Sequence, residues 1–389
     1  MLSLSNGGAN SFASSRPSNR LVIGTVDGVF MLDRDTAGWR VSGRALEGCA
    51  VGAVAGLSSG TLLAATHGLG VGRSTDGGDS WAWSNKGLPQ YDLWSARGGM
   101  LGGRDVAFVG SMPAHLMITE DDGTSWRELP GLCEVPSFPQ WTFPPPPHLG
   151  HIKEILLDGN RLFVGIEVGA LLASDDRGET FTDLRLDPDP TECDLHRLCV
   201  DPRDRAHMIA AVGLVGMVRS TDGGRSWTRH PVMPGMEYPD AFVMHPSDPD
   251  LLFLAVGVGW PPFRSGRAQG KIIRSRDGGC TWERLLGGLP DGQRALFSAL
   301  SIEVHDGGFD LYVADTDGQV FESRDGGEHW RIIADVAPVS KGEFHRTLAK
   351  GRPRIAGIDD IKVNRAAAAR LVAAGGPQER FLEDAGTGS

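Results

Sequence analysis

Short apolar runs recur along the chain at comparable places between Gly-rich, polar segments. Seven of them are Leu21–Thr25, Leu62–Thr66, Val106–Gly110, Leu162–Ile166, Met208–Val212, Leu252–Val256 and Leu311–Asp315. Continuous apolar runs of this length, bounded by turn residues, are typical of β-strands that are buried on both faces. We therefore expect each run to be the second strand of a repeated antiparallel unit.

One complete unit is clearest in the middle of the chain. Its four predicted strands, from first to last, are Asp194–Asp201, Met208–Val212, Gly216–Ser220 and Trp227–His230. A repeat of four short strands is typical of propeller blades, in which the first strand faces the central axis. Seven repeats predict an all-β fold, a single seven-bladed β-propeller with four-stranded antiparallel blades.

An eight-residue phrase marks the end of each third strand. It reads STDGGRSW at Ser220–Trp227, and related copies lie at Ser74–Trp81, Thr119–Trp126, Ser174–Phe181, Ser275–Trp282 and Ser323–Trp330, with a shorter one at Asp33–Trp39. In a tight hairpin an Asp side chain can bond the backbone two residues on, and Gly accepts a positive φ. The aromatic residue would then bury its ring between blades as the fourth strand starts.

This phrase resembles the Asp-box, or BNR, repeat of sialidases, xyloglucan-active glycoside hydrolases, sortilin-type receptors and photosystem II assembly propellers. The resemblance covers nearly the whole chain, and it implies the propeller fold. In those families the box is a structural turn far from the active site, so it does not imply a function. Neither the catalytic set of the sialidases nor their RIP tripeptide can be matched here, and xyloglucan-active enzymes use a cleft between two propellers. We therefore do not expect glycosidase activity.

Closure of the ring requires one more strand, because the first repeat begins at its second strand, Leu21–Thr25. The segment Glu343–Lys350 resembles the inner strand of the fifth repeat, with His345 matching His196. We predict that this C-terminal strand completes the first blade, since closure removes open sheet edges.

The predicted organisation has three parts. Residues 1–19 are expected to be a flexible N-terminal segment, 20–351 the propeller, and 352–389 a C-terminal tail. Within the tail, the composition of residues 365–376 favours a short helix.

The net charge of −11 provides no basic face, which argues against nucleic acid and anionic membranes as partners. The first twenty residues lack the apolar core of a signal peptide, so a cytoplasmic location is expected. Five cysteines without a CxxC pair are expected to be free thiols. The partner expected for this chain is therefore a small-molecule substrate or a protein. No motif indicates a nucleotide cofactor.

Candidate chemistry lies on the inner strands, which converge on the axis. Aligned without gaps, these strands place Ala50, Trp94, Lys153, His196, Asp240 and His345 at equivalent positions. The turns after the second strands add His67, Glu167, Asp315 and Asp317, and His148 and His151 lie at the edge of a Pro-rich loop. Imidazole and carboxylate groups in this number could hold a divalent metal ion or act as acid and base.

The expected roles are as follows. The candidate catalytic residues are His196, Asp240, His345, Lys153 and Glu167. The candidate substrate-binding residues are Trp94, His151, Arg197, Arg346, Trp141 and Trp260, the last on a long Pro-containing loop. The candidate ligands of one divalent metal ion are His67, His196 and His345.

Two functions follow from this arrangement. The first is a hydrolase or lyase that acts on a small polar molecule at the mouth of the channel. The second is a non-catalytic propeller that presents its loops to a protein, with the polar residues lining a solvated channel. A stoichiometric metal ion would favour the first.

Overall fold

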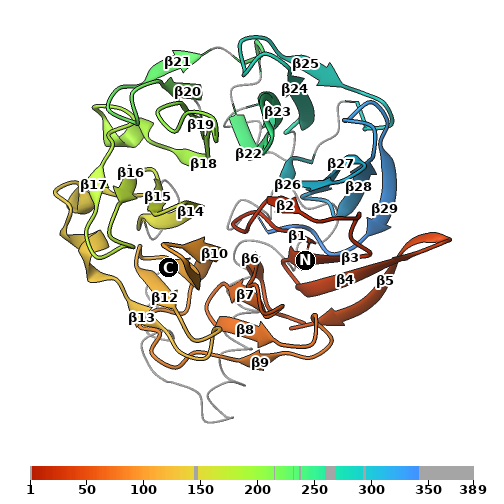
Figure 1. Ribbon diagram of the computed structural model, residues 1–389, viewed down its shortest axis with the longest axis horizontal. Coiled ribbons are helices and arrows are strands. Elements are labelled where there is room, and N and C mark those ends of the chain that lie inside the picture. Colours follow the sequence, from red (N-terminus) through yellow and green to blue (C-terminus); the bar gives the residue numbers. More distant parts are fainter. Residues whose placement is uncertain are drawn as a thin grey trace.

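The computed structural model describes residues 2–143, 148–213, 215–230, 232–235, 238–258, 268–291 and 295–340. Seven β-sheets form a ring around a central axis, with the first strand of each sheet nearest the axis (Figure 1). This arrangement confirms the predicted all-β, seven-bladed propeller.

The blades follow one another along the chain. Blade one consists of β1 (Leu2–Leu4), β3 (Arg20–Thr25), β4 (Gly28–Asp35) and β5 (Gly38–Ala45). Blade two consists of β6 (Val51–Gly56), β7 (Leu62–Thr66), β8 (Gly70–Ser74) and β9 (Ala82–Trp83). Blade three consists of β10 (Leu93–Leu101), β11 (Arg104–Ser111), β12 (Leu116–Thr119) and β13 (Arg127–Glu128). Blade four consists of β14 (His151–Asp158), β15 (Arg161–Glu167), β16 (Ala170–Ser174) and β17 (Thr182–Asp183).

Blades five and six have the same four-strand order, and blade seven has a fifth strand, β2, on the inner side of β26. Blade five consists of β18 (Leu195–Val200), β19 (Met208–Val212), β20 (Gly216–Ser220) and β21 (Thr228–His230). Blade six consists of β22 (Tyr238–His245), β23 (Asp248–Gly257), β24 (Lys271–Ser275) and β25 (Glu283–Leu285). Blade seven consists of β2 (Ser11–Ala13), β26 (Phe297–His305), β27 (Gly308–Asp315), β28 (Gln319–Ser323) and β29 (Arg331–Asp335). Three short 3-10 helices lie in connections: η1 (Pro130–Glu134), η2 (Phe138–Gln140) and η3 (Pro190–Glu192).

The second strands form the packed layer between neighbouring blades. Strands β7 and β19 coincide with the apolar runs predicted for them, and every residue of both is buried. A strand in this position has a blade on each side, so both of its faces are covered by apolar side chains. That environment explains why its sequence is continuously apolar rather than alternating.

The repeated phrase forms the turn between the third and fourth strands. In blade five, Oδ1 of Asp222 accepts the backbone N–H of Ser226 at 2.9 Å, and Oδ2 accepts its hydroxyl at 2.6 Å. The hydroxyl of Ser220 donates to the same carboxylate and accepts the N–H of Gly224, whose φ is +87°. The aspartate therefore bonds a residue four positions on, which corrects the expected bond two positions on. The same contact joins Asp76–Ser80, Asp121–Ser125, Asp176–Thr180, Asp277–Thr281 and Asp325–His329.

The aromatic residue after this turn connects adjacent blades. Trp126 is 5% exposed, and its indole N–H donates to the carbonyl of Ser84, which follows β9 of the preceding blade. Trp39 of blade one donates to Oε1 of Glu322 in blade seven. These contacts agree with the predicted position of the rings between blades.

The ring is closed by the start of the chain. Strand β1 pairs in parallel with β3, with Leu2 opposite Leu21 and Leu4 opposite Ile23. The inner edge of β3 was expected to receive Glu343–Lys350, and that expectation is wrong, because β1 occupies this edge and β4 occupies the other.

Strand β2 pairs in parallel with β26 of the last blade. Residues 2–13 thus bind the first and last blades together (Figure 1). They were expected to be part of a flexible segment, and the structure instead places them in two sheets. A three-residue strand carries little periodicity of its own, so its pairing depends on the edges that the other blades offer.

Between β1 and β2 the backbone passes close to the inner strands of blades two and three. The N–H of Gly7 donates to the carbonyl of Gly52 in blade two, and its carbonyl accepts the N–H of Ala96 in blade three, at 3.0 and 3.1 Å. A Cβ on Gly7 would lie 2.1 Å from the carbonyl oxygen of Trp94. Only glycine allows this approach of two backbones.

Residues of three further blades hold the same segment. The amide of Asn6 donates to the carbonyl of Ser298 at 2.8 Å and accepts from Nζ of Lys153 at 2.5 Å. The guanidinium of Arg197 donates to the carbonyls of Asn6 and Gly8. The N-terminal segment is therefore a partner of the inner strands all around the ring.

Several sequence-based expectations fall outside the described residues. They concern the C-terminal strand and tail from residue 341 on, including His345 and Arg346, and the loop that holds Trp260. Among the described residues, no helix has the length and apolar character needed to cross a membrane.

Candidate functional site

A β-bulge interrupts the inner strand of every blade from two to seven. The register shifts fall at Gly52, Trp94, Lys153, His196, Asp240–Ala241 and Ser298. A bulge adds one residue to a strand and redirects its side chain. The gapless alignment had placed four of these residues together and is confirmed for them. In blade two it gave Ala50, which is wrong, since the equivalent residue is Gly52.

Three of the expected residues meet in blade four. His151 and Glu167 lie opposite each other on β14 and β15, and Nε2 of His151 donates to Oε2 of Glu167 at 2.9 Å. Nζ of Lys153 lies 3.5 Å from the same oxygen. All three side chains are buried. The carboxylate is thus held by one imidazole and one ammonium group.

The electrostatics of this group favour an ionised glutamate. Burial by itself raises the pKa of Glu167, but the charge of Lys153 and the hydrogen bond from His151 outweigh it, so that the pKa lies well below its usual value. Burial lowers the pKa of His151, although Glu167 opposes this effect. At neutral pH, therefore, the His151 ring is neutral and donates a hydrogen bond to the charged carboxylate of Glu167.

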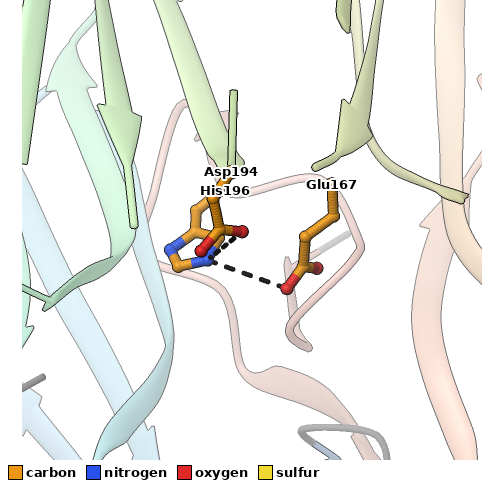
Figure 2. Close-up of side chains that lie close together, drawn as sticks. All are labelled: Glu167, Asp194 and His196. Atoms are coloured by element: carbon orange, nitrogen blue, oxygen red, sulfur yellow. Dashed lines mark ion pairs between the residues drawn. The ribbon is translucent and has the colours of Figure 1, made fainter. Parts of the chain in front are cut away.

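Blade five adds a histidine and a second carboxylate to the same place. Nε2 of His196 lies 3.3 Å from Oδ1 of Asp194 and 3.8 Å from Oε1 of Glu167 (Figure 2). An isolated β-bridge between Glu167 and Asp194 fixes the two carboxylates across the boundary of the blades. We call Glu167, Asp194 and His196 the carboxylate–histidine cluster.

Asp194 was not among the residues that the sequence indicated. Its signal was present, because Asp194 stands two residues before the bulge residue His196, as Asp92 stands two residues before Trp94. Asp92 makes the equivalent β-bridge to His67. Comparing the position two residues before each aligned residue would have found both aspartates.

His67 belongs to a neighbouring group. Its Nδ1 lies 3.1 Å from Oδ1 of Asp92, and Nε2 lies 3.3 Å from the hydroxyl of Ser340. The ring of Trp94 packs against both His67 and His151, at centroid distances of 4.7 and 3.9 Å. The expected metal ligands His67 and His196 therefore lie in two separate groups on the described residues, and the third, His345, lies outside them.

Two expected substrate-binding residues are used by the fold instead. Arg197 pairs with Glu154 at 2.8 Å in addition to its contacts with the N-terminal segment. Trp141 is 9% exposed and packs in the core between blades three and four, where its N–H donates to the hydroxyl of Ser137. Their side chains already have internal partners, and their role in substrate binding stays a prediction.

The remaining acidic candidates are buried. Asp240 lies at the bulge of β22 and is 1% exposed. Burial raises the pKa of Asp315 to about 6, and Oδ1 of this residue accepts the N–H groups of Asp317 and Gln319, both at 2.9 Å. Asp315 therefore caps the turn after β27.

Comparisons with known proteins identify the fold and leave the family open. No protein-family model matches the chain, and no curated protein matches its sequence. Solved structures with a similar fold include an ancestral GH74 enzyme, at 16% identity and a TM-score of 0.54 over 72% of this chain and 39% of that one. YCF48 bound to a D1 peptide is 19% identical, with a TM-score of 0.51 over 73% of this chain and 82% of that one. The WD40 β-propeller domain of Doa1 is 12% identical, with a TM-score of 0.55 over 84% and 96%.

These neighbours are propellers with different activities. The chain spans 39% of the length of the ancestral GH74 enzyme, and its identity to each of the three is below 20%. Similarity at this level shows a shared fold, and a shared fold does not carry a function.

Proposed function

We propose that the chain is a hydrolase or lyase that acts on a small polar molecule at the carboxylate–histidine cluster. One observation carries the proposal: Lys153, Glu167 and His196 come from separate strands and were each expected to be catalytic, and they meet at one end of the inner strands. Titratable groups gathered by burial and mutual charge are typical of sites that transfer protons.

The proposed roles follow from the contacts. Glu167 is the general base, because its charge is maintained by Lys153 and His151 and its Oε1 is directed toward His196. Lys153 stabilises negative charge that develops on the substrate. His196 positions the reacting group or returns the proton as a general acid.

The size of the substrate follows from the exposure of the cluster. The side chain of Asp194 is 18% exposed, whereas that of His196 is fully buried and that of Glu167 is 4% exposed. A ligand therefore approaches past Asp194, and only a small group reaches the other two. The net charge of −11 makes nucleic acid a poor substrate.

The test compares two histidine–carboxylate pairs. Glu167→Gln removes the base from the cluster, and Glu128→Gln alters the pair that Glu128 makes with His115 at 2.6 Å on the outer edge of blade three. The probes for hydrolase activity are 4-nitrophenyl esters, phosphates and glycosides. The probes for lyase activity are hydroxy acids whose elimination products absorb ultraviolet light.

We expect Glu167→Gln to lower a detected rate by about 10²- to 10⁴-fold and Glu128→Gln to leave it unchanged. Equal rates for wild type and both variants would contradict the assignment. Because Glu167→Gln leaves Lys153 without its full counter-charge, the melting temperature is measured alongside, and the rate is compared below the transition of each variant.

A non-catalytic interaction propeller is the second candidate. The observation that favours it is the use of Lys153 and Arg197 to hold the N-terminal segment, since side chains with structural partners are less available to a substrate. A protein partner that is retained after both Glu167→Gln and His196→Ala, in a chain without detectable turnover, would support this candidate over the enzyme.

A further inference from the structure

The ring of His196 has a defined orientation. Nδ1 of His196 makes a short contact with the carbonyl oxygen of Pro239 in blade six. A carbonyl can only accept, so Nδ1 carries the proton and donates it. In a neutral imidazole the other nitrogen, Nε2, then presents a lone pair.

That lone pair is directed at two groups that also carry lone pairs. Nε2 lies 3.3 Å from a carboxylate oxygen of Asp194 and 3.8 Å from one of Glu167, and Figure 2 draws both contacts. His196 is 0% exposed, and on the residues that the structure describes, Nε2 has no hydrogen-bond partner. The facing Oδ1 of Asp194 likewise has none. Buried polar atoms are usually paired, so this gap has to be explained.

We propose that the carboxylate–histidine cluster binds one divalent transition-metal cation, such as Mn²⁺ or Zn²⁺. A cation turns three mutually repelling donors into ligands, and two carboxylates neutralise its charge. An ion about 2.1 Å from each of two donors holds them roughly 3.4 Å apart at a tetrahedral angle. The three donor atoms lie within 4.8 Å of one another, with His196 and Asp194 already at 3.3 Å.

The residues behind the ligands are those that a metal site requires. The hydrogen bond to Pro239 directs Nε2 inward, as an outer partner commonly does for a metal-binding histidine. Oε2 of Glu167 is held by His151 and Lys153, which leaves Oε1 for the ion. One nitrogen with two oxygens favours Mn²⁺ or Zn²⁺ over the all-oxygen sites typical of Mg²⁺ and Ca²⁺.

This inference deepens the proposed function and rests on the same cluster. With the ion bound, Glu167 and His196 are its ligands in place of general base and general acid, and the ion could polarise a substrate oxygen or lower the pKa of a water molecule. Binding is measured without turnover, so the metal site and the enzyme can fail separately.

The experiment uses the full chain after treatment with a chelator. Mn²⁺, Zn²⁺, Mg²⁺ and Ca²⁺ are added separately, and bound metal is measured by equilibrium dialysis with elemental analysis. Asp194→Asn and His196→Gln each remove a ligand. Asp92→Asn is the matched control, because Asp92 has the same place in blade three and pairs with His67.

We expect one ion per chain, an affinity loss of more than about tenfold in both ligand variants, and no change in the control. Asp194 is partly exposed, so its variant should fold even if His196→Gln does not. The proposal is overturned if neither ion binds the wild type, if the control loses as much affinity as the ligand variants, or if only Mg²⁺ or Ca²⁺ binds. Nitrogen NMR of His196 gives an independent readout: two protonated ring nitrogens in the presence of metal would show an imidazolium ion pair in place of a metal site.

Discussion

The fit of the N-terminal segment against the inner strands can be tested with one methyl group. In Gly7→Ala the new Cβ would lie 2.1 Å from the carbonyl oxygen of Trp94 and 3.1 Å from the Cα of Ser95. Both atoms belong to a backbone and cannot rotate away. The segment must therefore move by about an ångström or more, which breaks the hydrogen bonds of Gly7 with Gly52 and Ala96.

The expected cost follows from those two bonds. A buried backbone group left without its partner costs about 1 to 3 kcal/mol, so the loss is about 2 to 6 kcal/mol. Replacing glycine by alanine also restricts the unfolded chain, which returns about 0.4 to 1 kcal/mol. We expect the free energy of unfolding to fall by about 2 to 5 kcal/mol.

The matched control is Gly56→Ala, in β6. Its Cβ would meet no atom closer than 3.8 Å, the Cδ2 of Leu62, and neither Gly56 nor Gly7 has a positive φ. Urea unfolding, followed by the fluorescence of the ten tryptophans, measures both variants against the wild type. If Gly7→Ala and Gly56→Ala unfold at the same urea concentration, the segment does not pass along the inner strands as described.

Three further predictions concern closure, packing and pH. Deletion of residues 2–14 should give insoluble or molten protein, because it exposes the inner edges of β3 and β26. Deletion of residues 341–389 should leave a chain that is soluble and melts cooperatively. Gel filtration and calorimetry distinguish these outcomes, and the reverse result would support closure by the C-terminus. Trp126→Ala should lower the free energy of unfolding by about 3 to 5 kcal/mol, as measured with urea, because it empties a site between two blades, and a loss below about 1 kcal/mol would contradict that burial. The hydrogen bonds from Ser226 lower the pKa of Asp222 from 3.8 to about 2, so its stabilising contribution is complete above pH 3.8 and is lost as the pH falls toward 2. The melting temperature of Asp222→Asn should accordingly depend less on pH in that window than that of the wild type, and parallel profiles would contradict the assignment.

The sequence was sufficient for the elements that repeat. The second strands could be predicted because burial on two faces makes a run such as Met208–Val212 apolar throughout. The equivalence of Trp94, Lys153 and His196 could be predicted because each inner strand carries its bulge at the same place, so that an alignment without gaps stays in register. In blade two the same alignment selected Ala50, because a glycine carries no side chain that would mark the bulge.

Features outside the repeat could not be predicted in the same way. Strand β1 is three residues long, and its pairing depends on an edge of β3 that is formed only by tertiary structure. The similarity of Glu343–Lys350 to the fifth inner strand therefore indicated the wrong partner for that edge. The cluster itself required Asp194, which begins the predicted strand Asp194–Asp201, but the alignment considered only the position of His196, two residues further on.

The position of the N-terminal segment has a consequence for biosynthesis. The hydroxyl of Ser301 donates to the carbonyl of Ser3, a contact across 298 residues, and Asn6 bonds Ser298 across 292. Ser3 and Asn6 thus leave the ribosome before their partners Ser301 and Ser298 are made, by roughly 15 to 60 s at ordinary rates of translation. During that interval the apolar Leu2 and Leu4 lack the residues of blade seven, such as Ala299 and Tyr312, that complete their packing. The ring can be sealed only after synthesis has passed the seventh blade, so we expect the start of this chain to be the part that depends most on chaperones.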